Sequence, residues 1–136
     1  MLVEVTAGLI EKDDKILIAR RKEDKHLAGF WEFPGGKIEN NETPEDCLKR
    51  ELFEEFSIIT EVCEFVAETI YKHSTKTIKL IAFIVKVLEG DFILKDHDNI
   101  KWVDLEEIKK YKLAPADIQI LKEYEYQRIN RKNNCF

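Results

Sequence analysis

A strong helix signal near the middle of the chain constrains the fold more than any other feature of the sequence. Thr43 is a good N-cap, Pro44 suits the first helical position, and Asp46 can close a variant of the capping box. Apolar residues then recur at helical spacing, so the sequence predicts an amphipathic helix over residues 44–56. Its apolar face is expected to carry Leu48, Leu52, Phe56 and Ile59.

A second face of this helix collects three negative charges. Glu51, Glu54 and Glu55 are spaced i, i+3 and i+4, which places them side by side on the helix surface. They lie in the C-terminal half, where the helix dipole disfavours negative charge, and each like-charged pair costs about 0.2–0.5 kcal/mol. They are either solvated surface residues or ligands of a hard cation such as Mg²⁺ or Mn²⁺. Such a conflict between local rules is typical of a functional site.

Predicted strands lie before and after this helix. They are expected at residues 3–11, 15–19, 31–33, 62–71, 77–88 and 100–103. A short helix is expected at 105–110 and a last helix from 114 or 115 to about 128, followed by a polar tail at 130–136. The apolar period of the last helix is marked by Ile118, Leu121 and Tyr124 or Glu125. This pattern predicts an α/β (α+β) fold with a sheet covered on both faces, in a single domain over residues 1–136.

Composition excludes several classes of protein. The 136 residues carry 22 Lys and Arg against 27 Asp and Glu, a net charge of −5, so a nucleic acid polymer is not expected as the main partner. No apolar run reaches the roughly 18 residues of a membrane span, and the N-terminus lacks the basic start of a signal peptide. Cys47, Cys63 and Cys135 are odd in number and far apart, which argues against a disulfide framework or a zinc site. We expect a cytoplasmic protein with no membrane contact and no obligate protein partner.

The acidic helix lies within a longer motif. Residues 36–58 read G-K-I-E-N-N-E-T-P-E-D-C-L-K-R-E-L-F-E-E-F-S-I and resemble the Nudix box, G-x5-E-x7-R-E-U-x-E-E-x-G-U, where U is aliphatic. The matching residues are Gly36, Glu42, Arg50, Glu51, Leu52, Glu54, Glu55 and Ile58. Ser57 stands where the family has glycine, a position that favours positive φ at the end of the helix.

The resemblance extends over nearly the whole chain. W-E-F-P-G-G-K-I-E at residues 31–39 and the pair Arg20-Arg21 are similar to the MutT branch of the family. L-A-P-A-D-I at residues 113–118 is similar to bacterial MutT-like enzymes that act on cytidine nucleotides. The resemblance implies the Nudix fold, a mixed β-sheet sandwiched between α-helices.

The resemblance also implies a metal site on the acidic face. In the family, the residues matching Glu51, Glu54 and Glu55 hold the metal ions, the backbone carbonyl matching Gly35 can join them, and the residue matching Glu51 can orient or deprotonate the water. A triphosphate brings about four negative charges, so an acidic pocket binds it only through divalent ions, here expected to be Mg²⁺ with Mn²⁺ as the alternative. Asp96 matches a further acidic metal ligand or base, although its segment D-H-D-N also fits a solvated loop.

Supporting residues are expected around these acids. Arg50 is four residues before Glu54 and next to Glu51, so it can pair with both carboxylates, and Glu42 can join the same network. Arg21 matches an arginine that lies near the substrate phosphates or sugar in the family, and its alternative is an ordinary surface position.

The histidines and aromatic residues give weaker signals. His26, His73 and His97 show no metal-ligand spacing and are interpreted as loop residues. Trp31, Phe33 and Trp102 fit the core, and Phe33, beside the glycines, can also contact a substrate.

The expected activity is hydrolysis of a nucleoside triphosphate to the monophosphate and pyrophosphate. Asp117 matches the asparagine with which the MutT enzyme reads 8-oxoguanine; an ionised aspartate only accepts hydrogen bonds and would suit a cytosine amino group or the guanine N1–H and N2–H edge at least as well. Removal of oxidised nucleotides such as 8-oxo-dGTP from the nucleotide pool is therefore one reading, and a (d)CTP or 5-methyl-dCTP pyrophosphohydrolase is the other. A nucleotide-binding regulatory module without hydrolysis is an alternative of another class.

Overall fold

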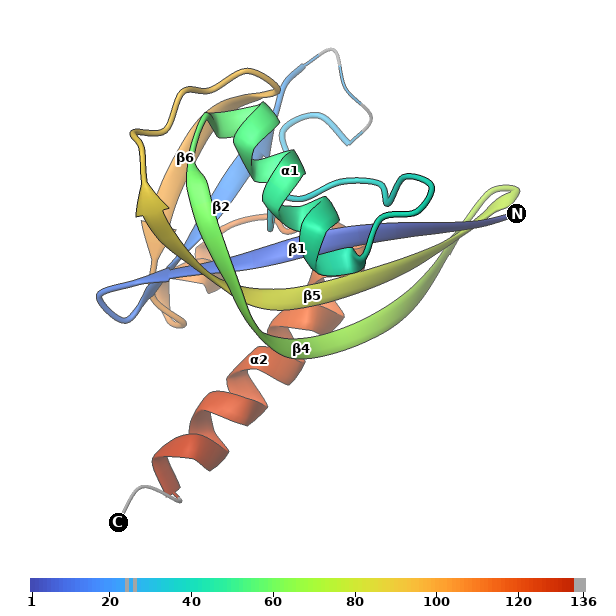
Figure 1. Cartoon of the computed structure of the whole chain (residues 1–136). Helices are drawn as coiled ribbons and strands as arrows, with labels where there is room; N and C mark the ends of the chain where they lie inside the picture. The colour runs from blue at the N-terminus through green and yellow to red at the C-terminus, as the bar shows by residue number, and fades with distance from the viewer. Residues whose placement is uncertain (24, 26, 134–136) are drawn as a thin grey trace.

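The fold is a mixed sheet with one main helix on each face, as the sequence predicts (Figure 1). The computed structural model describes residues 1–23, 25 and 27–133. The elements are β1 (Leu2–Lys12), β2 (Lys15–Arg21), β3 (Trp31–Glu32), α1 (Pro44–Phe56), β4 (Ile59–His73), β5 (Lys76–Glu89), β6 (His97–Val103), the 3-10 helix η1 (Glu107–Lys110) and α2 (Pro115–Asn133). No helix among these described residues is both long enough and apolar enough to cross a membrane.

The six strands follow the order β3-β2-β1-β5-β4, and β6 pairs with β2. β1 and β5 run parallel over nine residue pairs, whereas the β4–β5, β2–β3 and β2–β6 pairs are antiparallel. β1 and β2 pair only next to their connecting turn, through Glu11 with Ile16 and Lys12 with Lys15. The two strands therefore diverge beyond this turn, and the segment that follows β3 can lie against β1 there.

Two apolar clusters lie on opposite faces of the sheet. Residues 80–85 of β5 are buried without a polar break, because this central strand is covered on both sides. Leu80, Ala82 and Ile84 pack with the cluster under α2, whereas Ile81, Phe83 and Val85 pack with the cluster under α1. The alternation of side chains along one strand thus joins both helices to the same sheet.

Helix α1 starts and ends where its sequence signals predict. The Thr43 hydroxyl accepts a hydrogen bond from the Asp46 backbone N–H at 3.1 Å, and Pro44 occupies the first turn. Its buried residues are Cys47, Leu48, Leu52 and Phe56. The expectation for Ile59 was wrong: this residue begins β4 and is 47% exposed, while Ile58 is buried in its place.

Helix α1 ends on a residue in the left-handed conformation. Ser57 has φ 59° and ψ 35°, and its backbone N–H donates to the Phe53 carbonyl at 2.9 Å. A glycine adopts this conformation without a Cβ penalty. The motif departure at Ser57 therefore changes the energy of the helix end and preserves its geometry.

Replacing Ser57 by glycine is expected to stabilise the protein. Removing the side chain from a left-handed residue gains about 1 kcal/mol or more, and the extra freedom of glycine in the unfolded chain offsets part of this gain. We expect a net gain of about 0.5 kcal/mol, measured as a higher denaturant midpoint with an unchanged slope. A lower midpoint would show that the Ser57 side chain makes a contact worth more than the strain.

Helix α2 is longer than predicted and differs from the prediction at one apolar position. It continues to Asn133, so residues 130–133 of the predicted polar tail are helical, while 134–136, including Cys135, lie outside the described residues. Ile120 and Tyr124 face the core, Leu121 packs partly against it, and Ile118 is 45% exposed. The predicted period is therefore confirmed at Leu121 and Tyr124 and wrong at Ile118, because a polar residue, Asp117, occupies the first buried position of the helix.

The middle of α2 is fastened to the end of β1. The Tyr124 hydroxyl donates to Glu11 at 2.5 Å and accepts from Arg128 at 2.9 Å. Burial raises the pKa of Tyr124, and its hydrogen bond to Glu11 acts in the same direction, so the phenol remains a donor. This clamp fixes the helix against the sheet.

Candidate active site

A cavity of about 470 Å³ opens between the sheet, the start of α2 and the loops that follow β2 and β3. Val5, Ile78 and Leu80, from β1 and β5, give it an apolar wall, because Val5 pairs with Leu80 and Ile78 lies two residues along the same strand. Carboxyl groups line other parts of it, namely those of Glu32, Glu55, Asp96 and Asp117. Arg21, Phe33 and Gly35 also line the cavity, so it brings together six of the residues singled out in the sequence: Arg21, Phe33, Gly35, Glu55, Asp96 and Asp117.

The pKa of Glu55, one of the acids that line the cavity, is strongly raised. Burial raises its pKa to about 9, and the negative charges of Glu51, Glu32 and Asp96 act in the same direction. Its Oε2 atom is buried and has no hydrogen-bond partner among the described residues. A buried carboxylate oxygen without a partner, close to other acids, is chemically suited to a hard divalent cation.

Glu51 lies beside Glu55 and against the backbone of Gly36. A Cβ atom on Gly36 would clash with the Glu51 carboxyl group, and one on Gly35 would clash with the Thr6 backbone carbonyl. The Thr6 N–H donates to the Gly36 carbonyl at 2.8 Å, which ties this segment to β1. Both glycines are therefore required by close approach, one by the backbone and one by an acid of the site.

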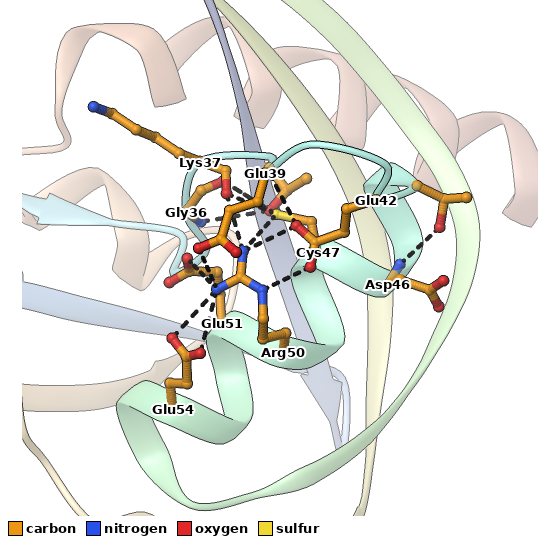
Figure 2. A network of polar contacts seen from close by, with 11 residues as sticks. Gly36, Lys37, Glu39, Glu42, Asp46, Cys47, Arg50, Glu51 and Glu54 are labelled. Carbon is orange, nitrogen blue, oxygen red and sulfur yellow. Dashed lines mark hydrogen bonds and ion pairs between the residues drawn. The ribbon is translucent and has the colours of Figure 1, made fainter.

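Arg50 is the centre of a polar network on the outer side of the same loop (Figure 2). Its Nε donates to Glu42 at 2.6 Å, its Nη1 donates to Glu51 at 3.0 Å and to Glu54 at 3.3 Å, and its Nη2 donates to the Lys37 carbonyl at 3.1 Å. The hydrogen bond from Arg50 holds the pKa of Glu42 at about 2. Arg50 thus fixes the carboxylates of three acids and one loop carbonyl at once.

The acids converge without forming a closed metal cage. Within the described part of the chain, no three His, Cys, Asp or Glu side chains are arranged so that they could hold a metal ion as they stand. Glu54 is exposed, and both Glu51 and Glu54 are engaged by Arg50. Coordination by these residues would therefore require rotation of side chains around the partnerless oxygen of Glu55.

Asp117, in the first turn of α2, also lines the cavity. It is 5% exposed, and burial raises its pKa well above the usual range, aided by the negative charge of Glu32. A hydrogen bond from the Phe33 backbone and the charge of Arg21 act in the opposite direction. The net shift favours the protonated form of this carboxyl, whereas the ionised form was considered from the sequence.

The sequence interpretation was wrong for two histidines and did not single out one acid of the cavity. His73 is the last residue of β4 and His97 the first of β6, so the loop interpretation was wrong for both, and His26 lies outside the described residues. The D-H-D-N segment is largely strand, with Asp98 bonded to Arg20 at 2.7 Å. Glu32 was not singled out, although an acid between the buried aromatics Trp31 and Phe33 is a detectable signal.

Comparison with known proteins identifies the family. The NUDIX domain model matches residues 2–124 of the chain. The chain belongs to the Nudix family. Its mixed sheet between two helices is accordingly the Nudix fold, and Nudix hydrolases generally use divalent metal ions.

Individual Nudix relatives are similar over most of their length. The CTP pyrophosphohydrolase of Escherichia coli K12 is 40% identical over 130 residues, covering 96% of each chain. The 8-oxo-dGTP diphosphatase of the same organism is 32% identical over 120 residues, covering 88% of this chain and 93% of the relative. The solution structure of the E. coli ORF135 protein superposes with a TM-score of 0.84 at 39% identity, covering 96% of this chain and 93% of that one. The relatives thus carry the names of both substrate readings.

Proposed function

We propose that this Nudix protein is a Mg²⁺-dependent hydrolase that cleaves a nucleoside triphosphate to the monophosphate and pyrophosphate. Hydrolysis adds one water across the α–β phosphoric anhydride. The partnerless buried oxygen of Glu55, in a cavity that also has an apolar wall, is the observation that carries the proposal. An anionic triphosphate is compatible with this acidic wall only when divalent cations lie between them.

The residues of the acidic wall take the roles implied by the family. Glu51, Glu54, Glu55, Asp96 and the Gly35 carbonyl would hold Mg²⁺, or Mn²⁺, which would neutralise phosphate charge and lower the pKa of a bound water. Glu51, half-buried beside Glu55, would orient or deprotonate the attacking water.

Three further residues would support this chemistry. Arg50 keeps the Glu51 and Glu54 rotamers fixed, and Glu42 holds Arg50 in turn. Arg21 lines the cavity while bonded to Glu32 at 2.8 Å, and it would contribute positive charge beside the substrate.

The base would be bound between Phe33, the apolar wall and Asp117. A protonated carboxyl offers one donor and one acceptor, like an amide. It can donate to N3 of cytosine while accepting from the N4 amino group, or donate to O6 of 8-oxoguanine while accepting from N7–H. Asp117 therefore supports both the 8-oxo-dGTP reading, with a role in nucleotide-pool sanitation, and the (d)CTP or 5-methyl-dCTP reading, which the similarity to the CTP pyrophosphohydrolase also favours.

A substrate panel tests the proposal. Pyrophosphate release is measured with Mg²⁺ for 8-oxo-dGTP, dCTP, CTP, 5-methyl-dCTP and dGTP, ranked by kcat/KM, with a chelator as the metal-free arm. We expect metal-dependent release from at least one of the first four and a higher Tm with metal than with chelator. Nucleotide binding without release from any of them would instead support the non-hydrolytic regulatory module.

Replacing Asp117 by Asn or by Ala separates hydrogen bonding from charge. Asn keeps one donor and one acceptor, so we expect kcat/KM for the best substrate to stay within a few-fold, whereas Ala should lower it about 10–100-fold. In the wild type, a rise in pH through the raised pKa of Asp117 removes its proton, so the affinity for the base should fall with increasing pH; in Asp117→Asn this dependence should disappear. KM measured over a series of pH values for both proteins checks this, and equal pH profiles would show that Asp117 does not donate to the base.

Three predictions from the sequence complete the proposal. We propose a single domain over residues 1–136, a cytoplasmic location and action without a nucleic acid polymer or an obligate protein partner. They rest on composition and cysteine usage.

A further inference from the structure

His97 lies in the wall of the cavity with no role yet in the proposed chemistry. It is 3% exposed, and its ring stacks on Phe56 with the centroids 5.3 Å apart and an interplanar angle of 15°. Its Nε2 is 2.8 Å from the Oε2 of Glu32. With a proton on Nε2, the ring donates to the carboxylate, and the stacking on α1 fixes the direction of that donor.

Glu32 is held from both sides. Its second oxygen, Oε1, accepts from Nη1 of Arg21 at 2.8 Å, so each carboxylate oxygen has its own donor. The three residues come from three different strands, β2, β3 and β6, and the pairing of β2 with β6 shifts register between Arg20 and Arg21 to place Arg21 opposite His97. Burial would raise the pKa of Glu32, but the bonds from His97 and Arg21 outweigh it and lower that pKa, so the carboxylate stays charged.

The position of Glu32 matters to both functional parts of the cavity. Its negative charge acts on Asp117, the proposed base-reading group, and on Glu55, the proposed metal ligand. Glu32 is thus a charge of the cavity wall that acts on both groups. A shift of its side chain would change the electrostatic surroundings of both groups.

We propose that His97 is a positioning residue for substrate recognition, which holds the Glu32 carboxylate at a fixed point of the cavity wall that Glu55 and Asp117 also line. This inference rests on the proposed function and extends it to a residue outside the acidic helix. The ring of His97 combines a flat surface that packs on Phe56 with a donor that reaches Glu32. A phenylalanine at this position would keep the packing and lose the donor.

The test compares His97→Phe with His97→Gln. Phe should raise KM for the best nucleotide about tenfold or more, the factor that corresponds to a hydrogen bond with a charged group, while kcat changes only a few-fold because the acids of α1 are untouched. Gln restores an N–H donor and should recover most of the affinity. In a Glu32→Ala background, which removes the acceptor, His97→Phe should change KM less than twofold, since the effect acts through the Glu32 carboxylate.

A matched control removes a similar bond elsewhere. Tyr124→Phe deletes a buried aromatic donor to the carboxylate of Glu11, far along α2 from Asp117. It should lower Tm and leave KM unchanged. An unchanged KM in His97→Phe, or additive effects with Glu32→Ala, would assign His97 a purely structural role.

Two measurements keep this test separate from the proposed hydrolysis. Binding of an α,β-methylene nucleoside triphosphate gives a Kd without turnover and should weaken in His97→Phe as KM does. The ¹⁵N NMR signals of the imidazole should show an Nε2 proton on His97 that is protected from solvent exchange, and that protection should be lost in Glu32→Ala. If the wild type binds the analogue but releases no pyrophosphate from the nucleoside triphosphates, the proposed hydrolysis is wrong, and the Kd still decides the role of His97 in binding. An Nε2 proton that is not protected from exchange would overturn the proposed role of His97.

Discussion

Glu55→Gln is expected to lower kcat about 10²–10³-fold while the folded protein becomes no less stable than the wild type. The loss of turnover follows because an amide is a poor ligand for a hard cation, and metal stabilisation of a transferring phosphoryl group is worth several kcal/mol. Stability is retained because the wild-type carboxyl is buried among the negative charges of Glu51, Glu32 and Asp96, which an amide does not repel. Glu54→Gln should also lower turnover.

In the metal-free protein, the contribution of Glu55 to stability should fall as the pH rises. The pKa of Glu55 is about 9 in the folded chain, above the ordinary value of 4.5. Its contribution to stability is therefore complete below pH 4.5 and is lost as the pH rises to about 9. In Glu55→Gln this contribution is absent, so Tm should fall less between pH 5 and pH 9 than it does in the wild type.

Glu45, on the same helix as Glu54 and Glu55, provides the control substitution. Glu45→Gln changes an exposed acid in the first turn of the same helix and should leave kcat unchanged. Near-normal turnover in both Glu54→Gln and Glu55→Gln would show that these two residues are not the metal ligands. A large loss of Tm in Glu55→Gln would show that the buried carboxylate is structural.

Alanine substitutions at the two adjacent glycines should have opposite consequences. In Gly36→Ala the new methyl group meets the end of the Glu51 side chain, which can rotate away, so Tm should change little. The displaced carboxylate should then cost about 10²-fold in kcat. In Gly35→Ala the methyl group meets the Thr6 backbone carbonyl inside the sheet, which cannot move freely, so the protein should lose several kcal/mol of stability.

Measuring Tm and kcat for both variants decides between the two effects. Gly29→Ala is an informative third variant, because its added Cβ meets no atom within 4 Å while its φ of 81° makes the backbone strained. It should lower stability without changing kcat. If Gly36→Ala kept full activity, the position of Glu51 against Gly36 would not matter to catalysis.

The helix that carries the acids could be read from the sequence because its signals are local. Thr43 and Pro44 mark its start, and Ser57, at the motif position that favours positive φ, marks its end. The strand predicted at residues 100–103 is confirmed, but its start at His97 was placed three residues too late because the surroundings of His97 depend on Arg21 and Phe56, which are distant in the sequence. In α2 the predicted core position at Ile118 was wrong because Asp117, a polar residue that lines the cavity, takes the buried position beside it.

The candidate site was predictable to a similar degree. The motif spacing placed the acids of α1 on one helix, but only the fold shows that Glu55 points into the cavity while Glu54 remains exposed at Arg50. The protonation of Asp117 was also out of reach, since it depends on burial and on the charge of Glu32. Local signals thus identify the residues, whereas their electrostatic states come from packing.

The Arg50 network has a consequence for how the loop of residues 37–42 moves. Several bonds from one guanidinium converge on this loop and on α1, so breaking a single bond does not release it (Figure 2). Opening of the loop would require these bonds to break, together with the one from the Ile38 N–H to the Glu4 carbonyl. A substrate therefore meets a loop that Arg50 already holds in place, whereas turning the Glu51 and Glu54 carboxylates toward a metal ion would cost part of their hydrogen bonds to Arg50.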